Sequence, residues 1–178
     1  MQGNSLLESD QILLRPIEPE DLELLYRVEN DGTVWTSCNT TMPYSKFFLK
    51  KYLESMQGDI FSDKQLRLVI EQKANYQPIG IIDLYDMVPL HQRAEIGIII
   101  LEEFRSLGYG KEAIFLLLEY AFSHLFLHQI YAYVAVSNTQ SVHLFKSCGF
   151  EEVAQLKDWI FTQDGFEDVL LLQKVAKD

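Results

Sequence analysis

The segment from Ala94 to about Leu125 constrains the fold more than any other part of the sequence. A continuous apolar run, "IGIIIL", predicts a buried strand, and the later stretch "EAIFLLLEYAF" predicts a helix. Between them stand Gly108 and Gly110, at the point where the helix should begin. Glycine weakens the interior of a helix, so glycines at its start indicate a role outside the helix. Because a helix start offers unpaired N–H groups and the positive end of a dipole, the segment predicts an anion site.

The remaining elements predict an α+β (mixed α/β) fold. Alternating apolar residues indicate strands in "QILLRP", "QLRLVIEQ" and "GIIDLYDMV", and "QIYAYVAVS" follows the glycine-opened helix. Helices are expected after Pro19, from about Ser45 to Gly58, and in "TQSVHLFKSCGF". The C-terminal stretch "WIFTQDGFEDVLLLQKV", which begins at Trp159, predicts a hairpin that turns at Asp164-Gly165. The order β-α-α-β-β-β-α-β-α-β-β predicts a twisted, mostly antiparallel sheet with one βαβ crossover and helices on both faces. Without a linker or repeat, residues 1–178 are expected to form a single domain.

The charge of the chain bears on the partners that it can bind. The net charge of -11 argues against nucleic acid or an anionic membrane, and it suits a cationic substrate.

There is no apolar run long enough to cross a bilayer and no signal peptide, so a cytoplasmic protein is expected. Cys38 and Cys148 lie far apart and are expected to be reduced thiols. His124 and His128 have no third ligand near them in the sequence, so no metal site is predicted.

The glycine stretch has the pattern R-x-x-G-x-G, from Arg105 to Gly110. It is neither the phosphate loop of the nucleotide hydrolases nor the dinucleotide-binding fingerprint. Arg105 and Lys111 add local positive charge, which favours a phosphate on the helix start. The alternative is a glycine-containing turn between strand and helix that binds no ligand.

Two motifs further along the chain add to this one. N-x-x-S begins at Asn138 after a strand, and K-x-x-G-F begins at Lys146 and closes the next helix. Together with R-x-x-G-x-G they resemble the GNAT superfamily of acetyl-CoA-dependent N-acetyltransferases. The likeness runs from "LLRPIEPEDLELL" to the C-terminal hairpin, toward the branch with bacterial spermidine N-acetyltransferases and ribosomal-protein N-alpha-acetyltransferases. The segment "HQRAEIGIII" resembles the spermidine enzymes in particular.

The resemblance implies acetyl-CoA as co-substrate and direct transfer in a ternary complex without a metal. The strand at 98–100 would diverge from the strand at 131–136, and the gap would hold the pantetheine arm. The pyrophosphate would bind the N–H groups of residues 105–111, and Asn138 would fix the pantetheine or the reacting amide region. The residues implied in coenzyme binding are Ile98, Ile99, Ile100, Arg105, Ser106, Leu107, Gly108, Tyr109, Gly110, Lys111, Asn138, Ser141 and Phe145.

Glu95 is the predicted catalytic base. An alkyl ammonium has a pKa near 10.4, so an acetyl acceptor must lose a proton before it can attack. Glu95 is an acidic residue in an otherwise apolar strand, and burial would raise its pKa toward the range of a base. The alternatives are that it pairs with Arg93 or Arg67, or that it faces water. Many GNAT relatives carry a tyrosine where this chain has Phe145, and phenylalanine has no proton to give to a leaving thiolate.

The predicted acceptor is a primary amine of a polyamine-like small molecule or of a protein N-terminus. Asp83 and Asp86 are candidate substrate residues, since the spermidine enzymes carry acidic residues in the matching stretch; the alternative is a solvated strand face. Where those enzymes place an acidic pair after the first helix, this chain has Thr40 and Thr41. A homo-oligomer is expected by the same resemblance. Because Phe145 stands where many relatives have a tyrosine, the alternative remains that the chain is a non-catalytic module, which binds acyl-CoA without turnover.

Overall fold

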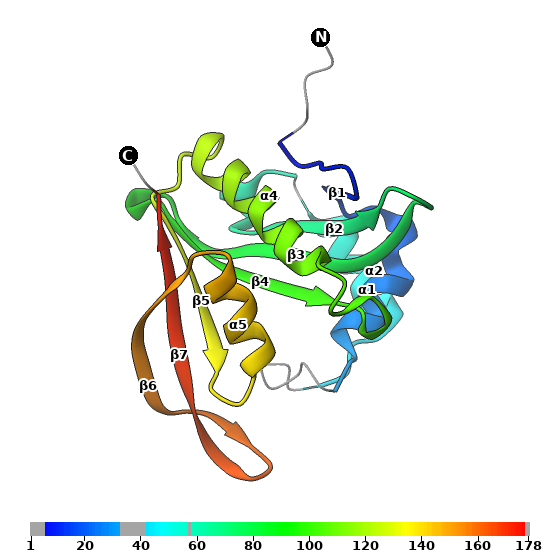
Figure 1. The fold of residues 1–178 in the computed structure, drawn as a ribbon. Helices are drawn as coiled ribbons and strands as arrows, with labels where there is room; N and C mark the ends of the chain where they lie inside the picture. The colour runs from blue at the N-terminus through cyan, green and yellow to red at the C-terminus, as the bar shows by residue number, and fades with distance from the viewer. Residues whose placement is uncertain (1–5, 33–41, 57, 177–178) are drawn as a thin grey trace. The chain divides into compact units, whose positions relative to one another are not determined.

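The computed structural model describes residues 6–32, 42–56 and 58–176 (Figure 1). The chain groups into two compact units. The first unit comprises Met1–Ile17, Gln57–Ile130 and Val175–Asp178; the second comprises Glu18–Met56 and Tyr131–Lys174. Each unit has its own strands and helices.

The first unit is an antiparallel sheet with the strand order β1-β2-β3-β4. Its strands are β1 (Ile12–Pro16), β2 (Leu66–Gln72), β3 (Gln77–Val88) and β4 (Arg93–Ile100), and the short helix α3 (Ile60–Asp63) precedes β2. In the β3–β4 pair, Ile82 faces Ile98 and Tyr85 faces Glu95. Alternate residues of β3 and β4, such as Ile82, Leu84 and Ile96, are buried. The residues between them therefore form the other face of the same pair.

The helix α4 (Tyr109–Ser123) covers the first unit's sheet and packs on β1 and β4 (Figure 1). Its buried residues recur every three or four positions, which places them on one side of the helix. They are Ala113, Ile114, Leu117, Leu118 and Ala121. Burial of this row against the strands forms the core of the unit.

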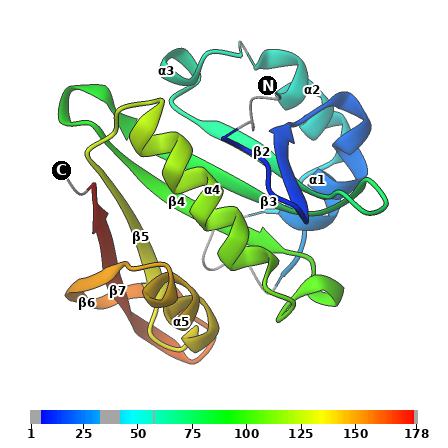
Figure 2. The same cartoon turned by 45° about the horizontal axis from the view of Figure 1, so that its top comes forward.

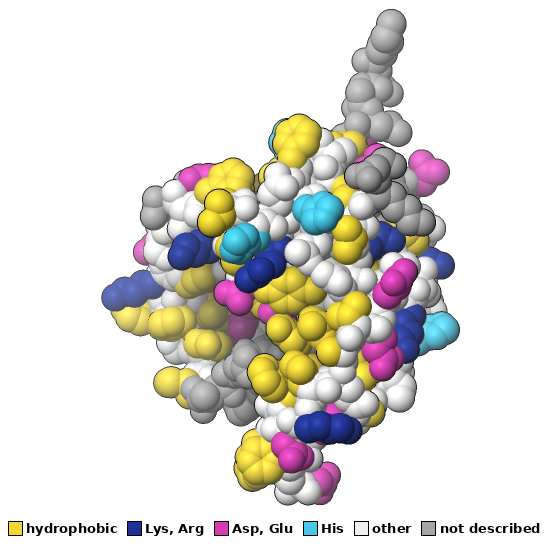
Figure 3. All heavy atoms as spheres, turned by 90° about the vertical axis from the view of Figure 1, so that its left-hand side faces the viewer, with side chains coloured by type: hydrophobic (Ala, Val, Ile, Leu, Met, Phe, Trp, Pro, Cys, Tyr) yellow, Lys and Arg dark blue, Asp and Glu magenta, His cyan; other side chains and the backbone are white. Residues whose placement is uncertain are grey.

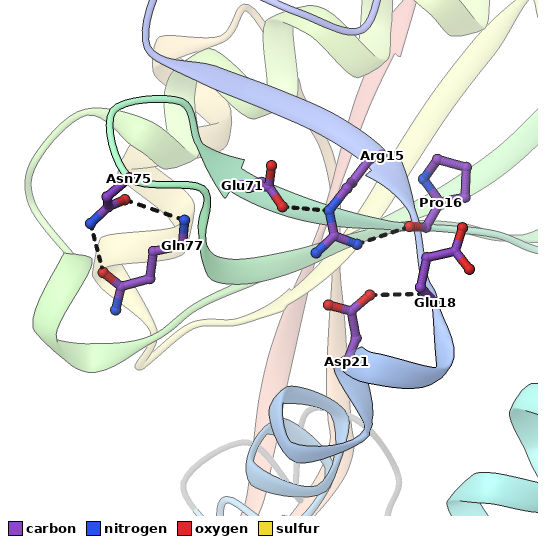
Figure 4. A network of polar contacts seen from close by, with 7 residues as sticks. All are labelled: Arg15, Pro16, Glu18, Asp21, Glu71, Asn75 and Gln77. Atoms are coloured by element: carbon purple, nitrogen blue, oxygen red, sulfur yellow. Dashed lines mark hydrogen bonds and ion pairs between the residues drawn. The ribbon is translucent and has the colours of Figure 1, made fainter.

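A partly buried ion pair joins the edge strand β1 of the first unit to its neighbour β2 (Figure 4). Arg15 Nε lies 2.6 Å from Glu71 Oε2, with 23% and 12% of the two side chains exposed, and a second guanidinium nitrogen donates to the Pro16 carbonyl. In the turn from β2 to β3, Asn75 Nδ2 donates to Gln77 Oε1. These contacts pair polar groups that the sheet would otherwise leave unmatched at its edge.

At Gly80, β3 lies too close to β4 to leave room for a side chain. It faces Ile100 across the pair, and a Cβ on Gly80 would lie 2.3 Å from the carbonyl oxygen of Ile99. On its other side Gly80 pairs with Ile70, immediately before a register shift between β2 and β3. A glycine inside a strand is typical of such a close backbone approach.

The second unit contains two N-terminal helices, α1 (Leu22–Glu29) and α2 (Lys46–Ser55), which pack together. A short turn precedes α1, in which the Glu18 backbone N–H donates to Asp21 Oδ2 at 2.8 Å (Figure 4). The side chain of Asn30 donates to the carbonyl of Tyr44 and accepts from its N–H. The end of α1 is thereby tied to the segment that leads into α2.

The C-terminal part of the second unit packs the helix α5 (Thr139–Ser147) on strands β5 (Gln129–Ala135), β6 (Glu151–Thr162) and β7 (Gly165–Val175). β7 lies between β5 and β6, and α5 lies beside β5 and β7 in both views (Figures 1 and 2). Phe145 of α5 meets Phe150 edge-to-face at 5.1 Å, and Lys174 Nζ donates to the Cys148 carbonyl. Cys148 itself is a buried thiol.

The predicted α+β class and the predicted order of the longer elements are confirmed. The single-turn helix α3 was not predicted. The strand β6 begins at Glu151, earlier than the sequence predicted. Thr162 pairs with Gly165, so the hairpin turns at residues 163–164, one position before the predicted turn. No helix in the described part of the chain is long and apolar enough to cross a membrane.

The backbone contact at Gly80 generates a stability prediction. Gly80→Ala is expected to lower the free energy of unfolding by about 1–3 kcal/mol, because the new methyl group would overlap the Ile99 carbonyl. Urea titration measures this change. Gly32→Ala is the control, because a Cβ there meets no described atom within 4 Å, and a change within about 0.5 kcal/mol is expected. Equal effects of the two substitutions would contradict the packing argument.

Candidate active site

The loop after β4 folds back on the end of that strand. Arg105 Nε donates to the Ile100 carbonyl at 2.9 Å, after a short 3-10 turn at Glu102–Phe104. Ser106 and Gly108 both have positive φ angles, of 62° and 92°. The loop therefore turns through a left-handed conformation immediately before α4, which only glycine adopts without strain at residue 108.

The start of α4 differs from the starts of the other α-helices that have a polar cap. Asp59, Ser45 and Asn138 accept hydrogen bonds from the first turns of α3, α2 and α5, whereas Gly108 offers α4 no side-chain oxygen. A Cβ on Gly108 would meet no described atom within 4 Å. An uncapped helix start beside open space fits an anion better than a buried turn.

Two further contacts support this arrangement. Gln72 Nε2 donates to the Tyr109 hydroxyl at 2.7 Å, which holds the first residue of α4 against the end of β2. Gly110 is the second residue of the helix, and Lys111 Nζ lies 5.8 Å from the ring centre of Phe115, one turn further along. Arg105 and Lys111 thus keep positive charge at both ends of the predicted anion loop.

Glu95 lies on β4 directly opposite Tyr85 of β3, and it is half-buried. The Tyr85 hydroxyl donates a hydrogen bond of 2.8 Å to Glu95 Oε1. Burial raises the pKa of Glu95 above its ordinary value; the Tyr85 hydrogen bond lowers the pKa, and the negative charge of Asp86 raises it. The net rise is in the direction that a general base requires.

The two candidate substrate carboxylates are placed differently. Asp83 forms a two-pronged ion pair with Arg67, at 2.9 Å from Nε and 3.0 Å from Nη2, and only 14% of its side chain is exposed. Asp86 is exposed and has a φ of 51°, within a register shift of the β3–β4 pair. Asp83 therefore compensates the charge of a mostly buried guanidinium, whereas Asp86 presents its charge to solvent.

The other predicted coenzyme residues fall into two groups. Ile98, Ile99 and Ile100 are half-buried and lie opposite residues 80–82 of β3. In the second unit, Asn138 Oδ1 caps α5 by accepting from the Ser141 N–H at 3.1 Å, which leaves its amide nitrogen to other partners.

Phe145 is 4% exposed in the core of the second unit, so little of its ring is open to a ligand. Cys38, Thr40 and Thr41 lie outside the described residues. Within the described ranges, no cluster of three or more His, Cys, Asp or Glu side chains could hold a metal ion.

Residues 11–151 match the family model of the acetyltransferase (GNAT) domain. The chain belongs to the GNAT acetyltransferase family. It is 32% identical over 161 residues to the spermidine N(1)-acetyltransferase of Vibrio cholerae, covering 90% of this chain and 91% of that protein. The crystal structure of a Vibrio cholerae spermidine N-acetyltransferase with CoA and spermine has a TM-score of 0.84 at 30% identity, over 94% of this chain and 96% of the other. A dodecameric structure of that enzyme has a TM-score of 0.79 at 30% identity, over 94% and 95%.

This GNAT acetyltransferase therefore has the fold that the sequence motifs implied, and its activity is that of an N-acetyltransferase. Sequence reasoning did not find the Tyr85–Glu95 contact or the Arg67–Asp83 pair. The sequence contained one sign of these contacts. Asp83 and Tyr85 lie two positions apart in a strand, so their side chains share a face of the sheet. Their partners on neighbouring strands follow only from the register.

The placement of Asp83 predicts a structural role that kinetics and stability can separate. Asp83→Asn should lower the free energy of unfolding by about 1–3 kcal/mol. The substitution removes the carboxylate that pairs with the Arg67 guanidinium, which is itself mostly buried. In an Arg67→Gln background the same substitution should cost clearly less. Asp86→Asn is the matched control, since Asp86 is exposed, and it should change stability by less than about 0.5 kcal/mol. Additive losses in the double variant would show that the pair contributes nothing.

Proposed function

We propose that this acetyltransferase transfers the acetyl group of acetyl-CoA to a primary amine of a polyamine-like small molecule. The observation that carries the proposal is the likeness, over nine-tenths of both chains, to an enzyme whose structure contains CoA and spermine. The chemistry of the described site supports it from two sides: an uncapped helix start for a phosphate, and carboxylates for a cationic amine.

The coenzyme pyrophosphate is assigned to the loop of residues 105–111. Gly108 offers open space, α4 contributes its positive end, and Arg105 and Lys111 contribute charge. Ile98, Ile99 and Ile100 are assigned to the pantetheine arm through their backbone groups, with Asn138 and Ser141 as further coenzyme contacts. When bound, acetyl-CoA supplies an activated thioester whose C–S bond breaks as the new C–N bond forms.

Glu95 is assigned as the base that takes the proton of the amine. The half-buried carboxylate has a raised pKa, so it holds a proton more readily than an exposed glutamate. The thiolate that departs needs no strong acid, and Phe145 provides none. The proton that Glu95 takes up is released to solvent after the acetylated amine leaves.

The substrate amine is assigned to the neighbourhood of Glu95 and Asp86. Asp86 carries a solvent-exposed negative charge one residue from Tyr85, and the chain has a net charge of -11, which attracts polycations from solution. Asp83 is a weaker candidate because Arg67 already neutralises it. A protein N-terminus carries a single positive charge and gains less from such a surface.

A homo-oligomer is part of the proposal, as in the dodecameric structure of the Vibrio cholerae enzyme. Hydrophobic side chains lie exposed at the end of the β6–β7 hairpin (Figure 3). Phe161 and Phe166 meet edge-to-face there, with 71% and 67% of their surfaces exposed. Exposed aromatic pairs of this kind favour contact with another protein surface. A cytoplasmic location remains a prediction.

An acceptor panel tests the proposed function. Release of coenzyme A from acetyl-CoA is measured with spermine, spermidine, a monoamine of similar length, and a peptide with an unblocked N-terminus. The polyamines should give a kcat/KM at least about tenfold above the monoamine, since each further cation gains from the acidic surface. Turnover with the peptide alone would replace the polyamine assignment, and coenzyme binding without any release would indicate a non-catalytic module.

Glu95→Gln tests the assignment of the base. The amide cannot take a proton, so kcat should fall by roughly 10²–10⁴-fold while acetyl-CoA affinity stays within about twofold. Calorimetric binding of acetyl-CoA to the variant provides the control, because Glu95 is not assigned to the coenzyme. A kcat within about threefold of the parent would mean that the amine loses its proton to solvent and that Glu95 has a structural role.

A further inference from the structure

We infer that Tyr85 is a positioning residue for Glu95 and that Gly97 provides the space its ring requires. The inference rests on the proposed role of Glu95 as the base and adds the groups that hold its carboxylate. The observation behind it is the hydrogen bond of 2.8 Å from the Tyr85 hydroxyl to Glu95 Oε1.

The register of β3 and β4 places these residues together. Tyr85 faces Glu95, and Gly97 follows Glu95 on the same face of β4. A Cβ on Gly97 would lie 3.1 Å from Tyr85 Cε1 and 3.7 Å from the Tyr85 hydroxyl oxygen. The phenol ring therefore lies across Gly97, and any side chain at that position would push the ring away.

The strand pairing changes register directly after Tyr85. The next paired residue of β3 is Val88, and Asp86 within the shift has a φ of 51°. Such a bulge redirects the side chains next to it. Two residues beside this register shift act on the pKa of Glu95 in opposite directions. The Tyr85 hydroxyl favours the ionised carboxylate, and the negative charge of Asp86 disfavours it.

Other charged groups of the first unit on this face are already paired or lie further along the strand. Arg67 and Asp83 form their ion pair in the row next to Glu95, opposite Gly97. Arg93 lies two residues before Glu95 on the same strand. Tyr85 and Asp86 are therefore the two β3 groups whose removal should move the titration of Glu95, in opposite directions.

The function of the bond is to orient the base. With Oε1 held by Tyr85, the carboxylate has a fixed rotation, and Oε2 is the oxygen that faces the incoming amine proton. Tyr85 does not receive the proton and acts only through Glu95. A phenylalanine at position 85 would keep the ring over Gly97 and remove only the donor.

The test compares the pH dependence of kcat/KM for spermine in three variants. Tyr85→Phe should move the acid limb upward by about 0.5–1.5 pH units and lower kcat by about 3–20-fold, because the carboxylate loses a stabilising donor and its fixed rotation. Asp86→Asn should move the limb downward by less, since a like charge is removed, and asparagine tolerates the positive φ. Tyr76→Phe is the matched control, as Tyr76 is 78% exposed in the β2–β3 turn, and should change neither quantity.

Gly97→Ala gives a second, independent variant. Its methyl group should displace the Tyr85 ring by a few tenths of an ångström and shift the acid limb in the same direction as Tyr85→Phe. In the double variant Tyr85→Phe/Gly97→Ala, the limb should lie where Tyr85→Phe alone puts it, because the donor is already absent.

An acid limb that stays in place in a folded Tyr85→Phe protein overturns the inference, and so do fully additive shifts in the double variant. Failure of the underlying base assignment looks different. In that case Glu95→Gln itself retains kcat. A large loss in Glu95→Gln with no effect of Tyr85→Phe removes the positioning role alone.

Discussion

The antiparallel pairing of β3 with β4 is the constraint on which the rest of the first unit depends. The pair is anchored at one end by the backbone contact of Gly80 with Ile99 and closes at the other where Val88 faces Arg93. A slip of one residue would exchange the two faces of a strand. Glu95 would then enter the apolar core and Ile96 would leave it. The hydrophobic core and the placement of the base are thus consequences of the same register.

Because side chains alternate between the two faces of β3 and β4, residues that pack in the core and residues of the candidate site lie on opposite faces. Leu84 and Ile96 are buried in the first unit's core, while Asp83, Tyr85 and Glu95 occupy the other face. Mostly buried charges on that face are costly unless they are paired. Arg67 offsets this cost for Asp83, and Tyr85 offsets part of it for Glu95. The remaining cost for Glu95 is what raises its pKa.

Much of the fold followed from local signals in the sequence, and the site followed only in part. The strands with apolar alternation and the helix that begins after Gly108 were predictable, because the pattern of apolar residues that identifies each of them lies within a short stretch of sequence. The start of β6 was not, since its first three residues, Glu151, Glu152 and Val153, are all exposed and so show no alternation of buried and exposed side chains. Contacts such as Arg67 with Asp83, 16 residues apart, depend on strand register, which local patterns do not specify.

The position of the Tyr85 ring over Gly97 links two residues that are 12 positions apart in the sequence. A Cβ at residue 97 would lie 3.1 Å from the ring at residue 85, so a side chain at 97 displaces the ring, and a larger side chain displaces it further. Loss of the ring would open room for a side chain at 97, whereas glycine at 97 accommodates the ring without displacement. Among descendants of a common ancestor, the two positions are therefore expected to change together more often than independently.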